Sequence, residues 1–326
     1  MIDSVYGGLI QIAVAYALDL AIGDPQWYYH PVRLIGRSIE GVESVLRKLP
    51  LPERMAGILL TTVIVMGTYF SVYVVMLLVR QRCLLCEVVL GVAIIYFTIS
   101  VKSLADEAKK VATSLRKNNL TEARRILSQI VGRDTAYLNE DQVVRACVET
   151  VAEGSVDGIL SPLFYSFIGG PYAAMAYRAV NTLDSMVGYK DKKYIRFGWA
   201  SARLDDIANY IPARISVLLI PMASFLYGGN FKGALKIAFR DGRKHESPNS
   251  GIPEAAIAGA LGVRLGGPST YQGEVVERPF IGDSNNPLTI KSIDMVIRIM
   301  YVTSILFLVF GIGFVVGLKY FVYEIY

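Results

Sequence analysis

The chain has 326 residues, of which 53% are hydrophobic and 19% charged, and its formal net charge is +5 at pH 7. So apolar a composition excludes an ordinary soluble enzyme and predicts segments that cross a lipid bilayer. The modest positive charge lies in the polar segments, without an arginine-rich helix or a zinc-finger spacing, so we expect no nucleic-acid partner.

Apolar stretches recur along the chain and predict an all-α fold, a multi-span integral membrane helical bundle with about five spans. The polar segments between the spans are expected to be partly helical and to carry the function within a single membrane-embedded domain, 1–326. The predicted spans are 5–22, 56–79, 84–101, 207–227 and 296–318, and the polar segments are 23–55, 102–206 and 228–292.

The first apolar stretch indicates the orientation of the chain. No Lys or Arg precedes it, no small-residue cleavage site follows it, and Arg33 and Arg37 come soon after it. It is therefore predicted to be a retained span with an external N-terminus. We expect a multi-pass protein of the plasma membrane, with its functional segments facing the cytoplasm.

The segment 158–180 leaves the topology open. It is moderately apolar but is interrupted by Pro162, Gly169, Gly170 and Pro171. A short re-entrant or interfacial segment fits this pattern as well as an additional span does. Five spans would also place the basic segment 228–292 outside, so either 158–180 crosses or one apolar segment enters and returns.

The cysteines give no sign of a disulfide framework, because the chain has three of them. Cys83 and Cys86 form a C-x-x-C without a second pair. We interpret them as packing residues, with metal or redox chemistry as the less favoured alternative. Cys147 lies on the apolar face of a predicted helix and is expected to be structural.

A first polar constellation follows the first span. Gly23, Asp24 and Pro25 predict a turn at the membrane surface, followed by His30 and Arg33. These last two side chains are close enough in sequence to reach one carboxylate or one bound anion.

A second constellation lies on a helix for which Asn139 is the predicted N-cap of a capping box. Arg145, Glu149 and Glu153 are spaced by four and share one face of that helix, and Asp157 lies one step further. Two carboxylates on one face can hold Mg²⁺ together with water or phosphate oxygens. The alternative is a ladder of ion pairs on a solvated face, which spacing alone favours.

A third constellation runs from 181 to 206. It combines Asn181, Asp184, Lys190 and Arg203 with several aromatic residues. Basic residues interleaved with aromatics can bind a large, flat, anionic ligand, and they can equally lie at a lipid headgroup interface.

The densest polar segment is 240–267, between two apolar stretches. It contains one of the chain's two histidines, His245, and then a small, Ala-rich stretch that predicts a closely packed helix. The start of that helix would present N–H groups to an anion. Other polar residues here are Arg240, Arg243, Lys244, Ser247 and Asn249. The alternative is a solvated connector. No P-loop, dinucleotide-binding glycine pattern or nucleophile elbow occurs anywhere in the chain.

Several motifs, taken in order, resemble those of one family. They are G-D-P-x-x-x-x-H-P-V-R-x-I-G at 23–36, R-D-T at 133–135, V-E-T-V-A-E-G-S-V-D-G at 148–158, N-T-L-D-S-M-V-G-Y at 181–189, F-G-W-A-S-A-R-L-D-D at 197–206 and the segment 240–267. In these motifs the chain resembles the CobD/CbiB family of cobalamin biosynthesis, the membrane-bound adenosylcobinamide-phosphate synthases. One departure is Gly154, where the family pattern leads us to expect Asn.

The resemblance implies an ATP-dependent amide ligation. A propionate of adenosylcobyric acid would be joined to 1-amino-2-propanol, expected as its O-phosphate, giving adenosylcobinamide phosphate. Two anionic reactants call for Mg²⁺ and cationic side chains, and the amine requires a base. The expected partners are these substrates and the lipid bilayer, with a homo-oligomer or contact with other enzymes of the pathway left open.

The resemblance gives no individual roles, so the assignments rest on residue type. His245, Glu153 and Asp184 are predicted to be catalytic, with His245 as the base, kept neutral by adjacent cations. Glu149, Glu153 and Asp157 are predicted to hold Mg²⁺. Substrate and phosphate binding is predicted for Asp24, His30, Arg33, Arg145, Asn181, Lys190, Arg203, Arg240, Arg243, Lys244, Ser247 and Asn249. The competing hypothesis is a non-enzymatic transporter, signalling protein or corrinoid-binding protein of the membrane.

Overall fold

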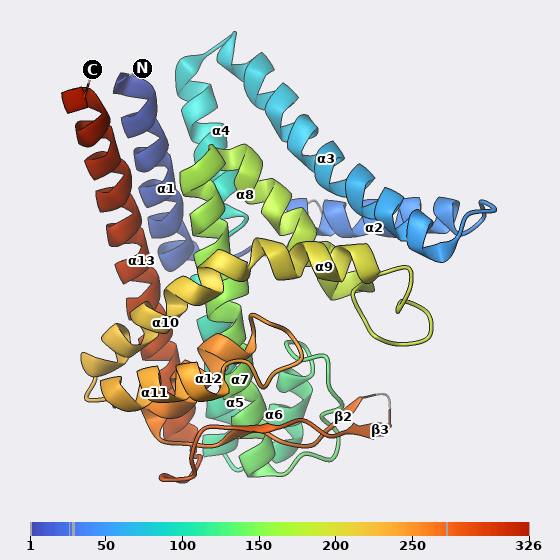
Figure 1. Cartoon of the computed structure of the whole chain (residues 1–326), viewed down its shortest axis with the longest axis vertical. Helices are drawn as coiled ribbons and strands as arrows, with labels where there is room; N and C mark the ends of the chain where they lie inside the picture. The colour runs from blue at the N-terminus through green and yellow to red at the C-terminus, as the bar shows by residue number, and fades with distance from the viewer. Residues whose placement is uncertain (1, 26, 28–29, 272, 326) are drawn as a thin grey trace. The chain divides into compact units, whose positions relative to one another are not determined.

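The structure is a computed structural model, and it describes residues 2–25, 27, 30–271 and 273–325. Helices dominate it (Figure 1), which confirms the all-α class. The helices are α1 Ile2–Ile22, α2 Pro31–Leu46, α3 Glu53–Arg80, α4 Leu84–Tyr96, α5 Val101–Arg116, α6 Leu120–Leu127, α7 Glu140–Ser155, α8 Ser161–Val187, α9 Trp199–Ala208, α10 Tyr210–Phe225, α11 Phe231–Asp241, α12 Gly251–Leu261 and α13 Ile290–Ile325, with a π-helical turn η1 at Val156–Leu160.

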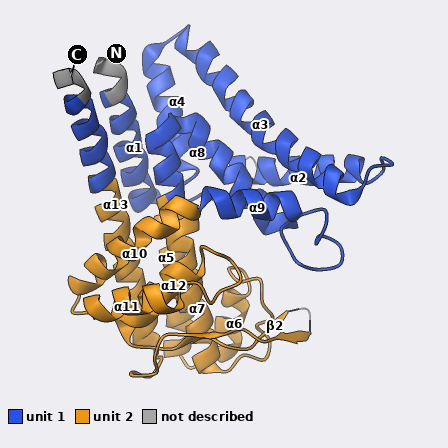
Figure 2. Cartoon of the chain, viewed as in Figure 1, with its two compact units in different colours: residues 1–100, 161–209, 310–326 blue, residues 101–160, 210–309 orange. Residues whose placement is uncertain are grey.

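The chain folds into two compact units (Figure 2). Unit 1 consists of residues 1–100, 161–209 and 310–326, and unit 2 of residues 101–160 and 210–309. Each unit is therefore built from segments far apart in the sequence. The single domain predicted from the sequence stays a prediction.

Several helices have the length and apolarity of membrane spans. The segments Glu53–Arg80, Leu84–Arg116 and Ile290–Phe321 each pass that test, and α9 with α10 adds a fourth if the pair is counted as one interrupted span. These cover four of the five predicted spans, while Tyr6–Ile22 is apolar but shorter. The chain has the helices of a membrane protein, and a crossing by 5–22 stays a prediction.

In unit 1, α2 packs against α3 and α8. The buried face of α2 is formed by Ile35, Ile39 and Leu46, which recur at helical spacing, whereas the opposite face is exposed. Leu60 of α3 and Leu183 of α8 complete this core. The amphipathic pattern of α2 thus fixes which side of the helix meets the rest of the unit.

Helix α8 is broken where the sequence pattern was interrupted. Gly169 and Gly170 depart from helical angles, with φ of +60° at Gly170, and Pro171 follows. A positive φ is accessible to glycine without steric cost, and proline cannot continue the hydrogen bonding of the preceding turn. The segment 158–180 is accordingly an interrupted helix and not one continuous span.

In unit 2, α7 begins as the sequence predicts. The side chain of Asn139 accepts a hydrogen bond from the backbone N–H of Gln142 at 2.9 Å, and the side chain of Gln142 accepts one from the backbone N–H of Asn139 at 2.8 Å. This capping box satisfies N–H groups that a helix start otherwise leaves without partners. The cap sets the register of α7 and, with it, the direction of the acidic face.

The Ala-rich helix α12 packs closely, as expected, and is buried from Gly251 to Ala260. A Cβ at Gly259 would lie 2.3 Å from the carbonyl oxygen of Gly233 in α11, so only glycine allows this approach. The helix begins at Gly251, two residues earlier than Pro253. Pro253 is tolerated there, because N–H groups in the first turn have no helical partner.

Two pairs of short antiparallel strands complete unit 2. Strand β1 (Leu265–Gly266) pairs with β4 (Phe280–Ile281), and β2 (Ser269–Tyr271) pairs with β3 (Glu274–Val276). They form the chain's connection from α12 to α13.

The cysteines differ in their surroundings. Cys147 is fully buried, which confirms its structural role, and burial raises the pKa of its thiol to about 12. Cys83 does not simply pack: its sulfur accepts a hydrogen bond from the backbone N–H of Cys86 and caps α4.

Candidate functional site

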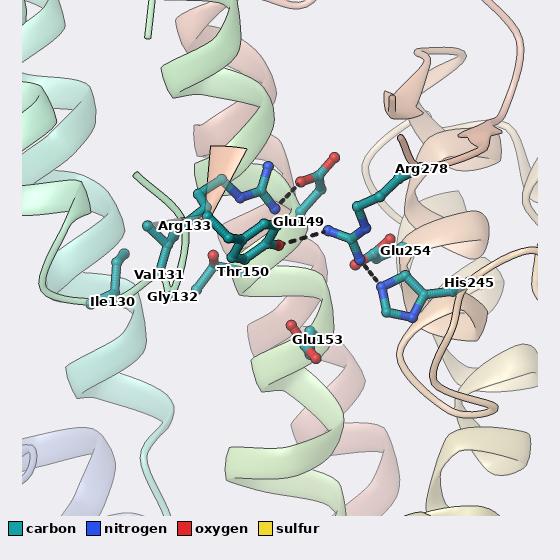
Figure 3. Close-up of a pocket in the computed structure, with 11 residues that line it drawn as sticks. Ile130, Val131, Gly132, Arg133, Glu149, Thr150, Glu153, His245, Glu254 and Arg278 are labelled. Carbon is teal, nitrogen blue, oxygen red and sulfur yellow. Dashed lines mark hydrogen bonds and ion pairs between the residues drawn. The ribbon is translucent and has the colours of Figure 1, made fainter. Parts of the chain in front are cut away.

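Unit 2 contains a cavity of about 270 Å³ (Figure 3). Its walls come from α7, from the loop before α12, from α12 itself, from the segment before α7 and from the strand region. The lining residues are Ile130, Val131, Gly132, Arg133, Glu149, Thr150, Glu153, His245, Glu254, Tyr271 and Arg278. Two predicted catalytic residues, Glu153 and His245, therefore face the same space.

Glu149 is held by an arginine. Its Oε2 accepts a hydrogen bond from Nη2 of Arg133 at 2.5 Å, and its Oε1 accepts one from the backbone N–H of Gly266 at 2.7 Å. Glu149 is 2% exposed, so the pair is a buried one. Burial opposes the charge of Arg133, but the adjacent Glu149 raises the pKa of its guanidinium above the usual value. Both oxygens of Glu149 are thus engaged within the protein.

Glu153 lies one turn further along α7. Its Oε1 accepts a hydrogen bond from Oγ of Ser250, the residue that precedes α12, at 2.7 Å. The carboxylate therefore lies near the N-terminal end of α12, where the helix dipole favours negative charge. The anion predicted at this helix start is here a side chain of the protein.

His245 is placed by the turn that precedes α12. Its Nδ1 accepts a hydrogen bond from the backbone N–H of Ser247 at 3.0 Å, and its Nε2 contacts Nη2 of Arg278. Burial, and then the charge of Arg278, lower the pKa of the imidazole. The prediction that adjacent cations keep His245 neutral thus has the correct direction, but burial and Arg278 are the causes.

The strand region brings Arg278 and Tyr271 to the cavity. Arg278 follows β3 and donates through Nη1 to Oη of Tyr271, at the end of β2, at 3.4 Å. Arg278 thus contacts two neutral side chains, Tyr271 and His245. Its positive charge is directed into the cavity and suits an anionic ligand.

Glu254 is a second deeply buried acid of the cavity. It lies in the first turn of α12 and is 3% exposed. Burial, and then the charges of Glu149 and Glu153, raise the pKa of its carboxyl well above the usual value. Its surroundings therefore favour the protonated form of Glu254, in which the carboxyl is a hydrogen-bond donor as well as an acceptor.

The geometry does not fit the predicted Mg²⁺ position. A metal ion at Glu149 would have to displace Arg133 and Gly266, and Asp157, on η1, is not among the lining residues. Among the residues that the structure describes, no group of three or more His, Cys, Asp or Glu side chains is arranged to hold a metal ion. The contacts of Glu149 therefore disfavour a metal ion at this triad.

Other predicted residues of unit 2 lie beside the cavity. Arg145 donates to the carbonyl oxygen of Pro268 at 3.2 Å, and burial lowers the pKa of its guanidinium. This face of α7 is therefore not a ladder of ion pairs exposed to solvent, which was the alternative that spacing alone favoured. At Gly154, a Cβ would lie 2.7 Å from Cδ2 of Leu104, so Asn at this position would require Leu104 to move.

Arg240 and Lys244 bind a carboxylate of the protein. Arg240 Nη2 and Lys244 Nζ each lie 2.7 Å from an oxygen of the buried Asp241. The backbone N–H of Gly282 also donates to Asp241, at 2.8 Å, and these contacts, led by Arg240, hold the pKa of Asp241 far below its usual range. The two cations anchor the end of α11, whereas Arg243 is exposed.

Ser247 and Asn249 shape the turn before α12. Ser247 Oγ accepts the backbone N–H of Asn249 at 3.2 Å, and Oδ1 of Asn249 accepts a hydrogen bond from Nη1 of Arg214 at 2.6 Å. Both predicted ligand-binding residues therefore position the loop that carries His245.

In unit 1, the first predicted constellation forms a local pair. His30 Nε2 lies 2.7 Å from Oδ1 of Asp24, and His30 Nδ1 accepts the backbone N–H of Val32 at the start of α2. His30 is buried, while Arg33, on the first turn of α2, is exposed. The pair fixes the entry into α2, and Arg33 is left accessible to solvent.

The third constellation is also in unit 1. Asn181 and Asp184 share a face of α8, and Arg203 of α9 pairs with Asp206 at 3.3 Å. Lys190 is exposed and acts electrostatically on Asp206.

Among the cavity residues that were not assigned a role from the sequence are the four with charged or phenolic side chains, Arg133, Glu254, Tyr271 and Arg278. Arg133 was part of a quoted motif, whereas Glu254, Tyr271 and Arg278 were not considered as site residues. Glu254 carried a signal that could have been used: it is the one charged residue in the run G-I-P-E-A-A-I-A-G-A-L. An acid in such an apolar helix is buried and therefore functional or paired. Arg278 and Tyr271 had no comparable local signal.

Comparison with known proteins gives matches over nearly the whole chain. The family model described as CobD/Cbib protein matches residues 12–300. "Cobalamin biosynthesis protein CobD" of Geobacter metallireducens is 49% identical over 293 residues, 89% of this chain and 91% of the relative.

Two further relatives are similar over an even larger share of their length. The protein of the same name from Leptospira interrogans is 43% identical over 310 residues, 95% of this chain and 98% of the relative. "Cobalamin biosynthesis protein CbiB" of Salmonella typhimurium is 46% identical over 309 residues, 94% of this chain and 97% of the relative. No solved structure matches the chain. With the family model covering most of the chain and relatives at this identity, the chain belongs to the CobD/CbiB family.

Proposed function

We propose that the chain is an enzyme of cobalamin biosynthesis that carries out an ATP-dependent amide ligation. It would join a propionate of adenosylcobyric acid to 1-amino-2-propanol O-phosphate and release adenosylcobinamide phosphate. The observation that carries the proposal is the cavity of unit 2, where Glu153, His245 and Arg278 converge in a member of this family.

The size and charge of the cavity suit the small reactant. About 270 Å³ is just below the range of roughly 300–1,000 Å³ that is typical of pockets for drug-sized ligands. A short phosphorylated amino alcohol, or the end of a propionate arm, fits such a space, and a corrin ring does not. Arg278 supplies the positive charge that a phosphate or carboxylate requires.

The surroundings of His245 favour a binding role. Its Nδ1 faces the backbone N–H of Ser247 and its Nε2 faces the guanidinium of Arg278, so both nitrogens of the neutral ring meet donors. The ring has one lone pair, and the N–H on its other nitrogen lacks an acceptor, which an anion bound beside it would supply. Because the lone pair already accepts from the protein in either tautomer, the predicted role of His245 as the base is disfavoured.

Glu153 is the better-placed base. It is an acid of the same cavity that accepts a hydrogen bond from the hydroxyl of Ser250, whereas Glu149 is bound to Arg133 and burial favours the protonated form of Glu254. A carboxylate can take the proton that the attacking amine loses. The roles predicted for the residues of unit 1 stay predictions.

The proposed reaction takes place in two steps. A propionate oxygen attacks the γ-phosphorus of ATP, which forms an acyl phosphate and releases ADP. The amine nitrogen then attacks the acyl carbon, the C–N bond forms, inorganic phosphate leaves, and the proton of the amine passes to Glu153. ATP reaches enzymes as its Mg²⁺ complex, and the charge of that ion favours phosphoryl transfer.

The apolar helices support a location of the protein in a membrane. We propose a multi-pass protein of the plasma membrane with its functional segments on the cytoplasmic side, where ATP is available. Cysteines introduced at Ser38 and Ser247 test this orientation, because a membrane-impermeant maleimide added to intact cells should label neither. Labelling at either position from outside would contradict it.

The ligation is tested with the full-length protein in detergent, supplied with adenosylcobyric acid, aminopropanol phosphate and Mg²⁺–ATP. ADP release and the mass of the corrinoid product are measured together. We expect ADP to depend on both other substrates, and Glu153→Gln to lose about 10²–10⁴-fold in turnover. Glu140→Gln, an exposed acid of the same helix, is the matched control and should retain activity. Corrinoid binding without ADP formation would support the transporter or binding-protein hypothesis instead.

A further inference from the structure

Helices α8 and α9 of unit 1 bring a group of acid and amide side chains together. Asn181 and Asp184 lie one turn apart on α8, and Asp205 and Asn209 lie one turn apart at the end of α9. The two helices pack against each other within the unit. This cluster is outside the cavity of unit 2, and the proposed reaction steps do not use it.

The amide of Asn209 is fixed by hydroxyl groups. Its Oδ1 accepts hydrogen bonds from Oγ of Ser161 at 2.6 Å and from Oη of Tyr177 at 2.8 Å. Its Nδ2 is therefore the group that faces Asp205, and it donates to Oδ2 of that residue at 2.9 Å. Asn209 is 1% exposed, so this orientation is enforced by buried contacts. The network holds Asp205 in one position by one of its two oxygens.

Asn181 supports Asp205 from α8. Its Oδ1 accepts a hydrogen bond from Nη1 of Arg178 at 3.3 Å, and its side chain also hydrogen-bonds Asp205. An amide whose oxygen faces an arginine presents its NH₂ group to the carboxylate. Two amides from two helices thus position the same acid.

The second oxygen of Asp205 has no such partner. Oδ1 is buried and forms no hydrogen bond with any residue that the structure describes. The charged groups that act on Asp205 are two other carboxylates, Asp184 and Asp206. Arg203 and Lys190 both act on Asp206, and Arg178 donates to Asn181. A half-buried acid among like charges, with one buried oxygen that lacks a hydrogen bond, is costly unless a positive group completes it.

We propose that Asp184 and Asp205 hold a divalent cation of the Mg²⁺ or Mn²⁺ class. These hard cations take oxygen ligands, and Mg²⁺ in particular is bound through one or two carboxylates with water or phosphate oxygens in its other positions. Oδ1 of Asp205 is directed at the site by the two amides, and Asp184 supplies the second carboxylate. The remaining positions on the cation would take water or an oxygen of a phosphorylated ligand.

The first test needs no variant and uses the full-length protein in detergent without nucleotide or corrinoid. Fe²⁺ replaces the natural cation, and ascorbate with peroxide then generates hydroxyl radicals that cut the backbone close to the bound metal. We expect cuts near 184 and near 205, mapped by mass spectrometry and suppressed by excess Mg²⁺. A pattern without cuts at these positions, or cuts that Mg²⁺ leaves unchanged, would overturn the proposal.

The second test measures Mn²⁺ binding by the electron paramagnetic resonance signal of the free ion. Asp205→Asn and, separately, Asp184→Asn should each weaken binding at least tenfold, whereas Glu40→Gln, an exposed acid of unit 1, and Glu153→Gln of unit 2 should not. Size-exclusion profiles identify any variant that fails to fold, and the other then decides. Unchanged Mn²⁺ affinity in a folded Asp variant would show a proton, and not a cation, on this acid. Because the readout is metal binding, the result is independent of the ligation.

Discussion

The acidic clusters of the two units differ in what surrounds the carboxylates. In unit 2, Glu149 is bound by Arg133, and Arg278 lies across the cavity with neutral partners. In unit 1, Asp205 is held by amides, and the charges that act on it are those of other acids. Both clusters are therefore built on carboxylates. In unit 2 the charges that act on the carboxylate are positive, whereas in unit 1 they are negative.

This difference indicates opposite ligands. In the cavity of unit 2, Arg133 and Arg278 offset the charge of Glu149 and Glu153, which favours an anion such as a phosphate or a propionate. A carboxylate that is held by neutral amides, as Asp205 is, favours a cation. Acid content by itself predicts Mg²⁺ at both places, which is why the sequence pattern favoured a metal at Glu149.

The largest effect is expected at the buried pair of unit 2. Arg133→Met leaves Glu149 buried without its partner, which costs about 3–5 kcal/mol of unfolding free energy. The measurement is unfolding of the protein in mixed detergent micelles by increasing SDS, followed by circular dichroism. Arg125→Met, which breaks the exposed pair with Glu122, is the control, and surface pairs contribute about 0–1 kcal/mol. Equal losses in both variants would contradict the difference in burial on which the comparison rests.

The second effect concerns the anion that the cavity is proposed to bind. Gln at position 245 can place an amide, which both donates and accepts, near the position of the imidazole, but it cannot accept a proton from the amine. We therefore expect His245→Gln to keep turnover within about tenfold, and His245→Ala to lose the hydrogen bond to the charged ligand, worth about 1.5–3 kcal/mol. A general base is worth about 10²–10⁴-fold. If Gln were as inactive as Ala, His245 would be the base and Glu153 would not.

Local signals in the sequence predicted the parts of the site that lie on one helix. The capping box at Asn139 and the spacing of Glu149 and Glu153 are properties of a few consecutive turns, and the structure confirms both the cap and the shared face. The closely packed helix after His245 was also predictable, because small residues at helical spacing allow close approach. Each of these inferences needs only the geometry of one helix.

The remainder of the site depends on contacts between distant segments. Arg278 meets His245 across 33 positions of sequence, and Gly266 meets Glu149 across 117. No periodic pattern reports such contacts, so Arg240 and Lys244, adjacent to His245 in sequence, were assigned to phosphate although they bind Asp241. Likewise, the partner of Glu149 could not be chosen among the chain's arginines until the fold was known.

The third prediction uses the pH dependence of stability to distinguish Glu254, whose pKa is raised, from the other acids. Its pKa is raised in the folded state, so the folded protein retains a proton that the unfolded chain loses above about pH 4.3. Stability therefore falls as pH rises from that value towards the folded pKa, by about 1.4 kcal/mol for each pH unit. Glu254→Gln carries no such proton, so its stability relative to the wild type should increase between pH 5 and pH 8.

The control for this pH dependence is Asp241, whose pKa is lowered in the folded state. Its contribution is complete above the unfolded pKa and is lost only in more acidic solution. Asp241→Asn should therefore be destabilised by the same amount throughout pH 5–8. A difference between Glu254→Gln and the wild type that did not change over this range would mean that Glu254 is ionised in the folded cavity.

The smallest effect is expected at the helix starts, which the two units build differently. In unit 2 the capping box of Asn139 begins α7, and in unit 1 His30 caps α2 while it also pairs with Asp24. Asn139→Ala removes one cap hydrogen bond, at a cost of about 1 kcal/mol. Thr121→Ala, an exposed change in α6, is the control and should stay within about 0.5 kcal/mol.

The position of the cap also predicts which residues of α7 exchange their amide hydrogens faster when the cap is removed. Fraying is confined to the first turn of a helix, and Glu149 lies more than two turns further on, where it is held by Arg133. Hydrogen exchange in Asn139→Ala should therefore accelerate at residues 140–142 and stay unchanged at 149–153, with turnover unaffected. Faster exchange at Glu149 would show that the cap, and not the buried pair, holds the acidic face of α7 in the cavity.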